Sequence, residues 1–153
     1  MNEEKSDYQE FDQTIGRLLR RIEKQRKLYM NEKLSCFGLR GSMYRFPLIL
    51  DRHPGASQEF ISERIGIDKS NNARLARKLE DLGYIERRPN GDNRRKYEIF
   101  LTESGKDLLP KIREQLNLWS KILVKGISSD EEKELIRLLS IMLENSERAE
   151  NHI

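Results

Sequence analysis

The sequence predicts a mainly α-helical protein with one short β-hairpin, and three observations support this prediction. Charged residues make up 36% of the 153 residues while Gly and Pro are sparse, which favours helices over irregular structure. Apolar residues recur at helical spacing along most of the chain, and strict alternation appears only at residues 97–101. A turn-forming run, Pro89-Asn90-Gly91-Asp92-Asn93, separates this alternating stretch from a second strand candidate at residues 84–88.

The length suits a single domain over residues 1–153. The hydrophobic fraction of 36% is enough for a modest core but lean for an elongated helical monomer. No apolar run is long enough to span a bilayer, and the acidic, polar residues 1–12 do not resemble a signal peptide. A single cysteine excludes an intramolecular disulfide. We therefore expect a cytoplasmic protein that does not enter a membrane.

Residues 8–28 are predicted to form a first long helix. Its narrow apolar stripe consists of Phe11, Ile15, Leu18, Leu19 and Ile22. Residues 17–27 hold six Lys or Arg against one Glu. This basic run is either an additional contact to nucleic-acid phosphates or a solvated face whose aliphatic stems cover apolar surface. The lack of interleaved aromatic residues favours the solvated face.

Residues 29–42 are predicted to form a loop or a short irregular helix. The residues that indicate this are Asn31, Ser35, Gly38 and Gly41. The next helix is expected around residues 43–52 and ends at His53-Pro54-Gly55. Pro47 has no N–H to donate, so it either begins this helix or kinks it.

Two short helices follow, at residues 58–65 and 69–82, joined by a turn that contains Gly66. Ser57 and Asp68 are suited to cap them. The apolar side of the second helix is predicted to consist of Ala73, Leu75, Ala76, Leu79 and Leu82, and its polar side of Ser70, Asn71, Arg74, Arg77, Lys78 and Asp81. Such a pair is typical of a helix-turn-helix, which lays its second helix in the major groove of DNA.

Residues 84–88 and 96–101 are predicted to be the two strands of a hairpin with a basic tip. Residues 69–96 hold nine Lys or Arg against four Asp or Glu, a local charge of +5 compared with +3 for the whole chain. The positive charge is therefore concentrated where DNA phosphates would be met. Residues 43–101 are accordingly predicted to be a winged helix-turn-helix DNA-binding lobe.

Thr102 is predicted to cap a helix that runs to about residue 125, and Ser128 and Glu131 form a capping box for a last helix. The wide apolar face of that last helix comprises Leu135, Ile136, Leu138, Leu139, Met142 and Leu143. It favours a homodimer with residues 1–30 and 102–150 as dimerisation helices. The alternative is that these helices only close the core of one chain.

These residues resemble the MarR family of bacterial and archaeal transcriptional regulators. The resemblance rests on residues 67–87, on Asp92-Asn93-Arg94, and on Leu101-Thr102-Glu103-Ser104-Gly105, and it covers about residues 38–143. It implies a winged helix-turn-helix with N- and C-terminal dimerisation helices and a homodimer on a palindromic operator in double-stranded DNA. Members of this family are more often repressors than activators.

The hairpin departs from the family pattern in one respect. Seven residues separate Arg94 from Thr102, one more than the family usually has. Either the wing carries a one-residue bulge, or Asn93 and Arg95 occupy the motif positions. The residue expected in the minor groove is thus Arg94 or Arg95.

Several side chains are expected to contact DNA. Those predicted to touch base edges or adjoining phosphates are Ser70, Asn71, Asn72 and Arg74. Those predicted to hold the backbone from the same helix are Lys69, Arg77 and Lys78. In the wing, Asp92 is expected to orient the minor-groove arginine, with phosphate contacts added by Arg87, Arg88 and Lys96.

In this family a ligand pocket lies between the dimer helices and the DNA-binding lobe. The resemblance therefore points to Tyr29, Cys36, Arg40 and Tyr44 as pocket residues. We hypothesise a small-molecule effector that changes the separation of the two reading heads. Cys36 is interpreted as inert and packed rather than redox-active, because only Lys33 and Arg40 are near enough in sequence to lower its pKa.

The main competing interpretation is a winged helix used for protein contact or as a non-specific, architectural DNA-binding protein. The Asn and Arg residues of the second helix argue against it, since lysines would serve a purely electrostatic binder equally well. An enzyme is disfavoured, because there is no paired His and carboxylate and no Gly-rich phosphate loop. Neither a cofactor nor a metal is expected, since one cysteine and two histidines are too few for a structural zinc site.

Overall fold

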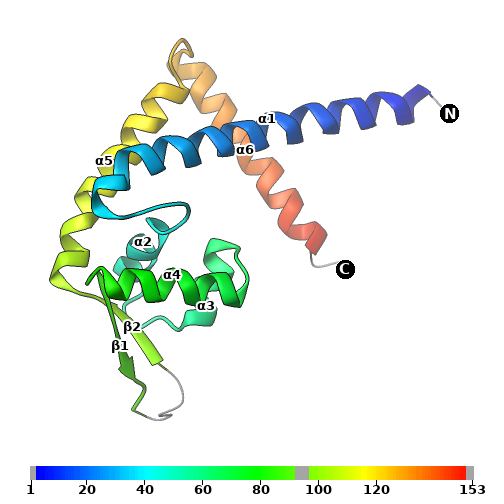
Figure 1. Ribbon diagram of the computed structural model, residues 1–153. Helices are drawn as coiled ribbons and strands as arrows, with labels where there is room; N and C mark the ends of the chain where they lie inside the picture. Colours follow the sequence, from blue (N-terminus) through cyan, green and yellow to red (C-terminus); the bar gives the residue numbers. More distant parts are fainter. Residues whose placement is uncertain (1–2, 92–96, 151–153) are drawn as a thin grey trace. The chain divides into compact units, whose positions relative to one another are not determined.

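The described part of the chain is mainly α-helical with a two-stranded antiparallel sheet, as the sequence predicts. The computed structural model describes the backbone of residues 3–91 and 97–150, and the side chains of residues 14–91 and 97–149. In chain order the elements are α1 (Glu3–Leu34), the 3₁₀ turn η1 (Ser35–Phe37), α2 (Arg45–Arg52), α3 (Gln58–Ile65), α4 (Lys69–Asp81), β1 (Ile85–Pro89), β2 (Tyr97–Leu101), α5 (Glu103–Leu123) and α6 (Ser129–Glu150) (Figure 1). Within the described ranges no helix is long and apolar enough to cross a membrane.

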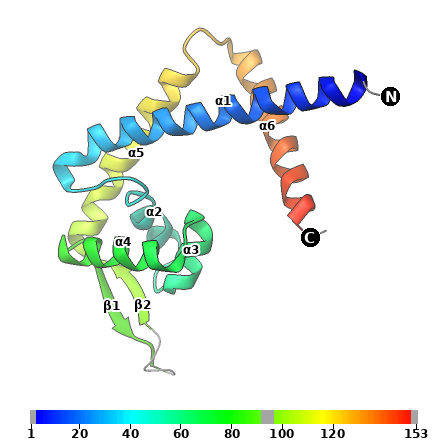
Figure 2. The same ribbon diagram turned by 45° about the vertical axis from the view of Figure 1, so that its right-hand side comes forward.

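The chain forms two compact units, residues 1–116 and residues 117–153. The first unit holds the hydrophobic core, to which α1, α2, α3, α4, both strands and α5 all contribute. Its fully buried members include Met30, Phe46, Ile61, Leu79 and Ile99. Around this core α2, α3 and α4 lie together, and the hairpin extends away from them in both views (Figures 1 and 2).

Helix α1 extends further than predicted. The expectation of a loop or short irregular helix at residues 29–42 is wrong for residues 29–34, which continue α1. Met30 and Leu34 lie one turn apart and are both buried, so the core stabilises this additional segment. The Asn31 side chain accepts a hydrogen bond from the Gly41 N–H at 2.6 Å, which ties the following loop back to the helix.

Helix α2 begins at Arg45, so Pro47 is its third residue. Pro47 therefore lies in the first turn, where no N–H is needed for an intrahelical hydrogen bond, although it is not the first helical residue. Arg45 connects α2 to α3, because its guanidinium donates to the carbonyl oxygens of Ile65 at 2.9 Å and Arg64 at 3.3 Å. These bonds satisfy carbonyl groups at the C-terminus of α3.

The hairpin has the predicted antiparallel pairing, with strand boundaries shifted by one residue. Its register pairs Ile85 with Leu101 at one end and Pro89 with Tyr97 at the other. A bridge that the sequence did not predict joins the other edge of β2 to the segment before α3, where the N–H of Ile99 donates to the carbonyl of Ala56 at 3.2 Å. This bridge attaches the base of the wing directly to the helix-turn-helix.

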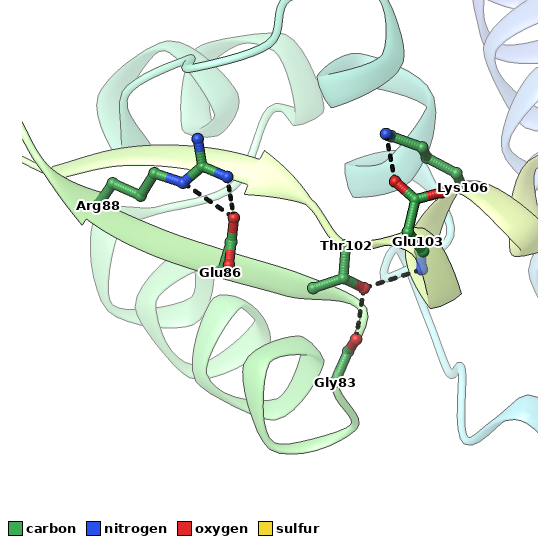
Figure 3. Close-up of polar contacts among 7 residues, drawn as sticks. Gly83, Glu86, Arg88, Thr102, Glu103 and Lys106 are labelled. Carbon is green, nitrogen blue, oxygen red and sulfur yellow. Dashed lines mark hydrogen bonds and ion pairs between the residues drawn. The ribbon is translucent and has the colours of Figure 1, made fainter.

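Thr102 caps α5, as predicted, and also connects it to the end of α4. Its hydroxyl accepts a hydrogen bond from the N–H of Gly105 at 3.0 Å and donates to the carbonyl of Gly83 at 2.5 Å (Figure 3). The backbone N–H of Thr102 donates to the carbonyl of Tyr84 at 3.1 Å. Thr102 thus connects the start of α5 to the segment between α4 and β1.

Replacing Thr102 with valine is expected to lower the free energy of unfolding by about 1–2 kcal/mol, because valine keeps the shape but loses the capping hydroxyl. The measurement is urea unfolding at one fixed protein concentration. Thr102→Ser retains the hydroxyl and is the matched control, expected to stay close to the wild type. Equal stability of the valine variant and the wild type would contradict this role.

The second unit contains the end of α5, a turn and α6. The predicted capping box is present: the Ser128 N–H donates to a Glu131 carboxylate oxygen at 2.8 Å, and the Glu131 N–H donates to the Ser128 hydroxyl at 3.3 Å. The backbone bond from Ser128 lowers the pKa of the Glu131 carboxyl. The apolar side chains of α6 are exposed in the single chain, Ile136 by 58% and Leu143 by 59%.

Candidate nucleic-acid interface

The helix-turn-helix is built from α3 and α4, with both predicted caps in place. The Ser57 hydroxyl accepts from the Phe60 N–H at 3.2 Å, and an Asp68 carboxylate oxygen accepts from the Asn71 N–H at 2.8 Å. Gly66, in the left-handed region at φ +74°, ends α3 and turns the chain into α4. Local sequence therefore determines where α3 and α4 begin.

The exposed face of α4 is polar and basic, while its opposite face is buried in the core. The buried residues are Asn72, Ala76 and Leu79. The exposed candidates are Lys69, Ser70, Arg74, Arg77 and Lys78, and Asn71 is half-buried. This face therefore brings together six of the seven residues that the sequence assigned to DNA from this helix.

Asn72 is the exception, and its predicted contact with a base edge is wrong. The side chain is 0% exposed. Its amide nitrogen donates to the carbonyl of Gln58 and to the Ser62 hydroxyl, both at 2.6 Å, so it holds α4 against α3. Its buried amide oxygen has no hydrogen-bond partner among the described residues. Ala73, expected on the apolar side, is exposed instead.

Two of the candidates on this face already interact with each other. The Arg74 guanidinium donates to the Asn71 side-chain oxygen at 2.8 Å, one turn away on α4. This bond orients the Arg74 side chain. Because the Asn71 amide is neutral, it does not offset the positive charge of the guanidinium. Lys69 instead lies 3.4 Å from a carboxylate oxygen of Glu59, in an exposed ion pair.

The basic residues at the base of the wing are paired with carboxylates. Arg87 lies 3.2 Å from Glu80 of α4. Arg88 donates to Glu86 twice, from Nε at 2.9 Å and from the guanidinium end (Figure 3). Its guanidinium also stacks on the Phe100 ring, 4.4 Å from the ring centroid. The other wing candidates, Asp92, Arg94, Arg95 and Lys96, lie outside the described residues.

The four residues assigned to a ligand pocket do not line one common pocket among those described. Tyr29 is half-buried and donates to the Gln115 side chain at 3.2 Å, whereas Tyr44 is buried, which raises the pKa of its phenol. Cys36 is exposed on η1, so the expectation that it is packed is wrong. Arg40 lines a groove together with Arg74 and Lys78 of α4.

The described residues contain no group of three His, Cys, Asp or Glu side chains that could hold a metal ion. His53 caps the C-terminus of α2. Its ring packs edge-on against Phe60 with the ring centroids 4.9 Å apart. Its contacts are therefore those of a structural residue between α2 and α3.

A capped helix-turn-helix with a basic face and an adjoining hairpin defines the winged-helix class of DNA-binding proteins. The MarR family model matches residues 48–97. A MarR transcriptional regulator from Methanosarcina mazei Go1 is 31% identical and superposes with a TM-score of 0.83 over 90% of this chain and 99% of that one. The chain belongs to the MarR family, and is therefore a DNA-binding transcriptional regulator and not an enzyme.

Two curated relatives agree with this assignment. The HTH-type transcriptional regulator BilQ of Clostridioides difficile (strain CD3) is 25% identical over 130 residues, which cover 85% of this chain and 88% of BilQ. The uncharacterized HTH-type transcriptional regulator YybA of Bacillus subtilis (strain 168) is 29% identical over 118 residues, which cover 77% of this chain and 79% of YybA.

Proposed function

We propose that this chain is a homodimeric, sequence-specific repressor that binds a palindromic operator in the cytoplasm. The observation that supports this most is the solvent-accessible face of α4, which carries Ser70, Asn71 and Arg74. On the buried face of the same helix, Asn72 holds α4 against α3. Asparagine amides and arginine guanidinium groups make bidentate hydrogen bonds to adenine and guanine. A face that carries both residue types is suited to read sequence as well as charge.

The remaining contacts are assigned by position and charge. Arg77 and Lys78 are exposed and form no ion pair with a described residue, so phosphates would be their partners. Lys69, Arg87 and Arg88 would contact phosphates only after leaving their glutamate partners. Either Arg94 or Arg95 enters the minor groove from the wing, with Asp92 orienting it and Lys96 on the backbone.

Arg74→Ala is expected to cost about 1–3 kcal/mol of binding free energy on the operator and much less on a random duplex, because the lost contact is to a base. The measurement is fluorescence anisotropy with both duplexes at the same salt concentration. Arg77→Ala removes an exposed charge from the same helix and is the matched control, with a similar loss on both duplexes. If Arg74→Ala weakened the two duplexes equally, its assignment as a base reader would be wrong.

The dimer is supported by the apolar surface that a single chain leaves exposed on α6. Its members include Leu135, Ile136, Leu138, Leu139, Ile141 and Leu143. A contiguous apolar face of this kind marks an interface, and a second copy matches the two-fold symmetry of a palindrome. Sedimentation equilibrium at micromolar concentration should give the mass of two chains. A monomer under these conditions would exclude the dimer.

Release by a small molecule is supported by a structural neighbour. PcaV of Streptomyces coelicolor, which shares the fold, was crystallised with its natural ligand. A ligand that changed the separation of the two α4 helices would lower operator affinity, because a dimer matches one half-site spacing at a time. Titrating a panel of aromatic acids into the operator complex tests that ligand class, and unchanged affinity throughout would remove it.

A further inference from the structure

A groove of about 350 Å³ lies between α1, the loop before α2 and the exposed side of α4. Four cationic side chains line it: Lys27, Arg40, Arg74 and Lys78. None of the described Asp or Glu side chains lines this groove. Lys27 belongs to the basic run of α1, which the sequence suggested was only a solvated face.

The positive charge of the groove is not neutralised by the described part of the chain. Lys27, Arg40 and Lys78 form no ion pair with any residue whose side chain is described. Arg74 is bound to the neutral amide of Asn71. By contrast, Lys69, Arg87 and Arg88 each have a glutamate partner. The groove therefore brings together four cations that form no ion pair with a described carboxylate.

The position of the groove determines what an anion there would be. Asn71 and Arg74 form one wall, and they are the side chains assigned to base edges. Lys27 of α1 and Arg40 of the loop before α2 line the same groove. A helix in the major groove is flanked by the sugar-phosphate backbone, so cations beside its base-reading residues face phosphates. Several adjacent cations suit a polyanion better than one small anion.

We propose that Lys27 and Arg40 hold backbone phosphates of the operator, and that α1 is therefore part of the DNA-binding surface. This inference rests on the proposed docking of α4 in the major groove. It extends the DNA contact beyond residues 43–101, because Lys27 and Arg40 both precede that lobe. The ligand is the phosphate oxyanion of a duplex strand.

The test compares Lys27→Gln and Arg40→Gln with the wild type on the upstream DNA of its own gene and on a random duplex. Each variant should bind both duplexes about threefold to fivefold more weakly, the scale of one exposed ion pair. Each should also reduce the slope of log K against log salt by about 0.9. Arg21→Gln is the matched control, because Arg21 is exposed on α1 and lines none of the described pockets.

Wild-type salt slopes and affinities in both groove variants would overturn the inference. So would equal losses for Arg21→Gln, which would indicate a general effect of net charge. A thermal-shift titration with inorganic phosphate tests whether the groove binds a free phosphate ion instead of a DNA phosphate. If phosphate stabilised the wild type but not Arg40→Gln while both bound DNA equally, the groove would be a site for a free anion.

The outcomes also separate this inference from the proposed function. Equal affinity of the wild type for both duplexes would refute sequence-specific regulation, yet the losses caused by Lys27→Gln and Arg40→Gln would still be measured on each duplex. A specific wild type with unaffected groove variants would refute only the groove contact.

Discussion

Asn72→Asp is expected to lower the free energy of unfolding by about 3–5 kcal/mol at neutral pH, the scale of an uncompensated buried charge. Asn72 is fully buried between α3 and α4, and its amide nitrogen donates to the Gln58 carbonyl at 2.6 Å. An ionised carboxylate in its place cannot donate a hydrogen bond. Its negative charge would instead lie against the Gln58 carbonyl oxygen, which repels it. Stability is measured by urea unfolding of both proteins at the same concentration.

The loss caused by Asn72→Asp should depend on pH. Burial raises the folded-state pKa of the introduced carboxyl above its unfolded value, so the destabilisation is present at neutral pH and decreases as pH falls through the folded-state pKa. Asn71→Asp is the matched control: it is the same change on the preceding residue, which is only half-buried and close to the N-terminus of α4. Similar unfolding midpoints for the two variants would contradict the buried role of Asn72.

Gly105→Ala is expected to cost about 3 kcal/mol or more of unfolding free energy, although alanine is normally the better helix residue by about 1 kcal/mol. A Cβ at this position would lie 2.0 Å from the carbonyl oxygen of Tyr84. That oxygen belongs to the backbone and accepts from the Thr102 N–H, so it cannot move without displacing the cap of α5.

Gly16→Ala provides the control for Gly105→Ala. Gly16 is also inside a helix, α1, and nothing lies within 4 Å of the position its Cβ would occupy. Its replacement should raise stability by up to about 1 kcal/mol, the helix propensity gain alone. If both glycines gave the same small gain on thermal unfolding, the close approach of α5 to the wing strands would be refuted.

Features set by neighbouring residues in the sequence could be predicted. The caps at Ser57, Asp68 and Thr102 and the capping box at Ser128 depend on side chains within three residues of the helix ends they satisfy. They located α3 and α4 to within a residue, and with them the exposed basic face that forms the candidate interface.

Features set by tertiary packing could not be predicted in the same way. The last turn of α1 forms because Met30 and Leu34 enter a core built from distant segments. Asn72 and Ala73 exchanged their expected sides because a buried asparagine needs partners from α3, whereas an alanine is small enough for either environment. Lys27 and Arg40 are distant from α4 in the sequence, and only folding places them in one groove with Arg74 and Lys78.

The most direct test of a specific, dimeric regulator is hydroxyl-radical footprinting of the purified protein on the DNA upstream of its own gene. A dimeric regulator should give two protected half-sites related by a dyad, with centres about one helical turn apart, roughly 34 Å. Protection should appear at concentrations that leave a random duplex unprotected. Uniform protection of both DNAs would contradict sequence-specific regulation and would indicate a non-specific, architectural DNA-binding protein.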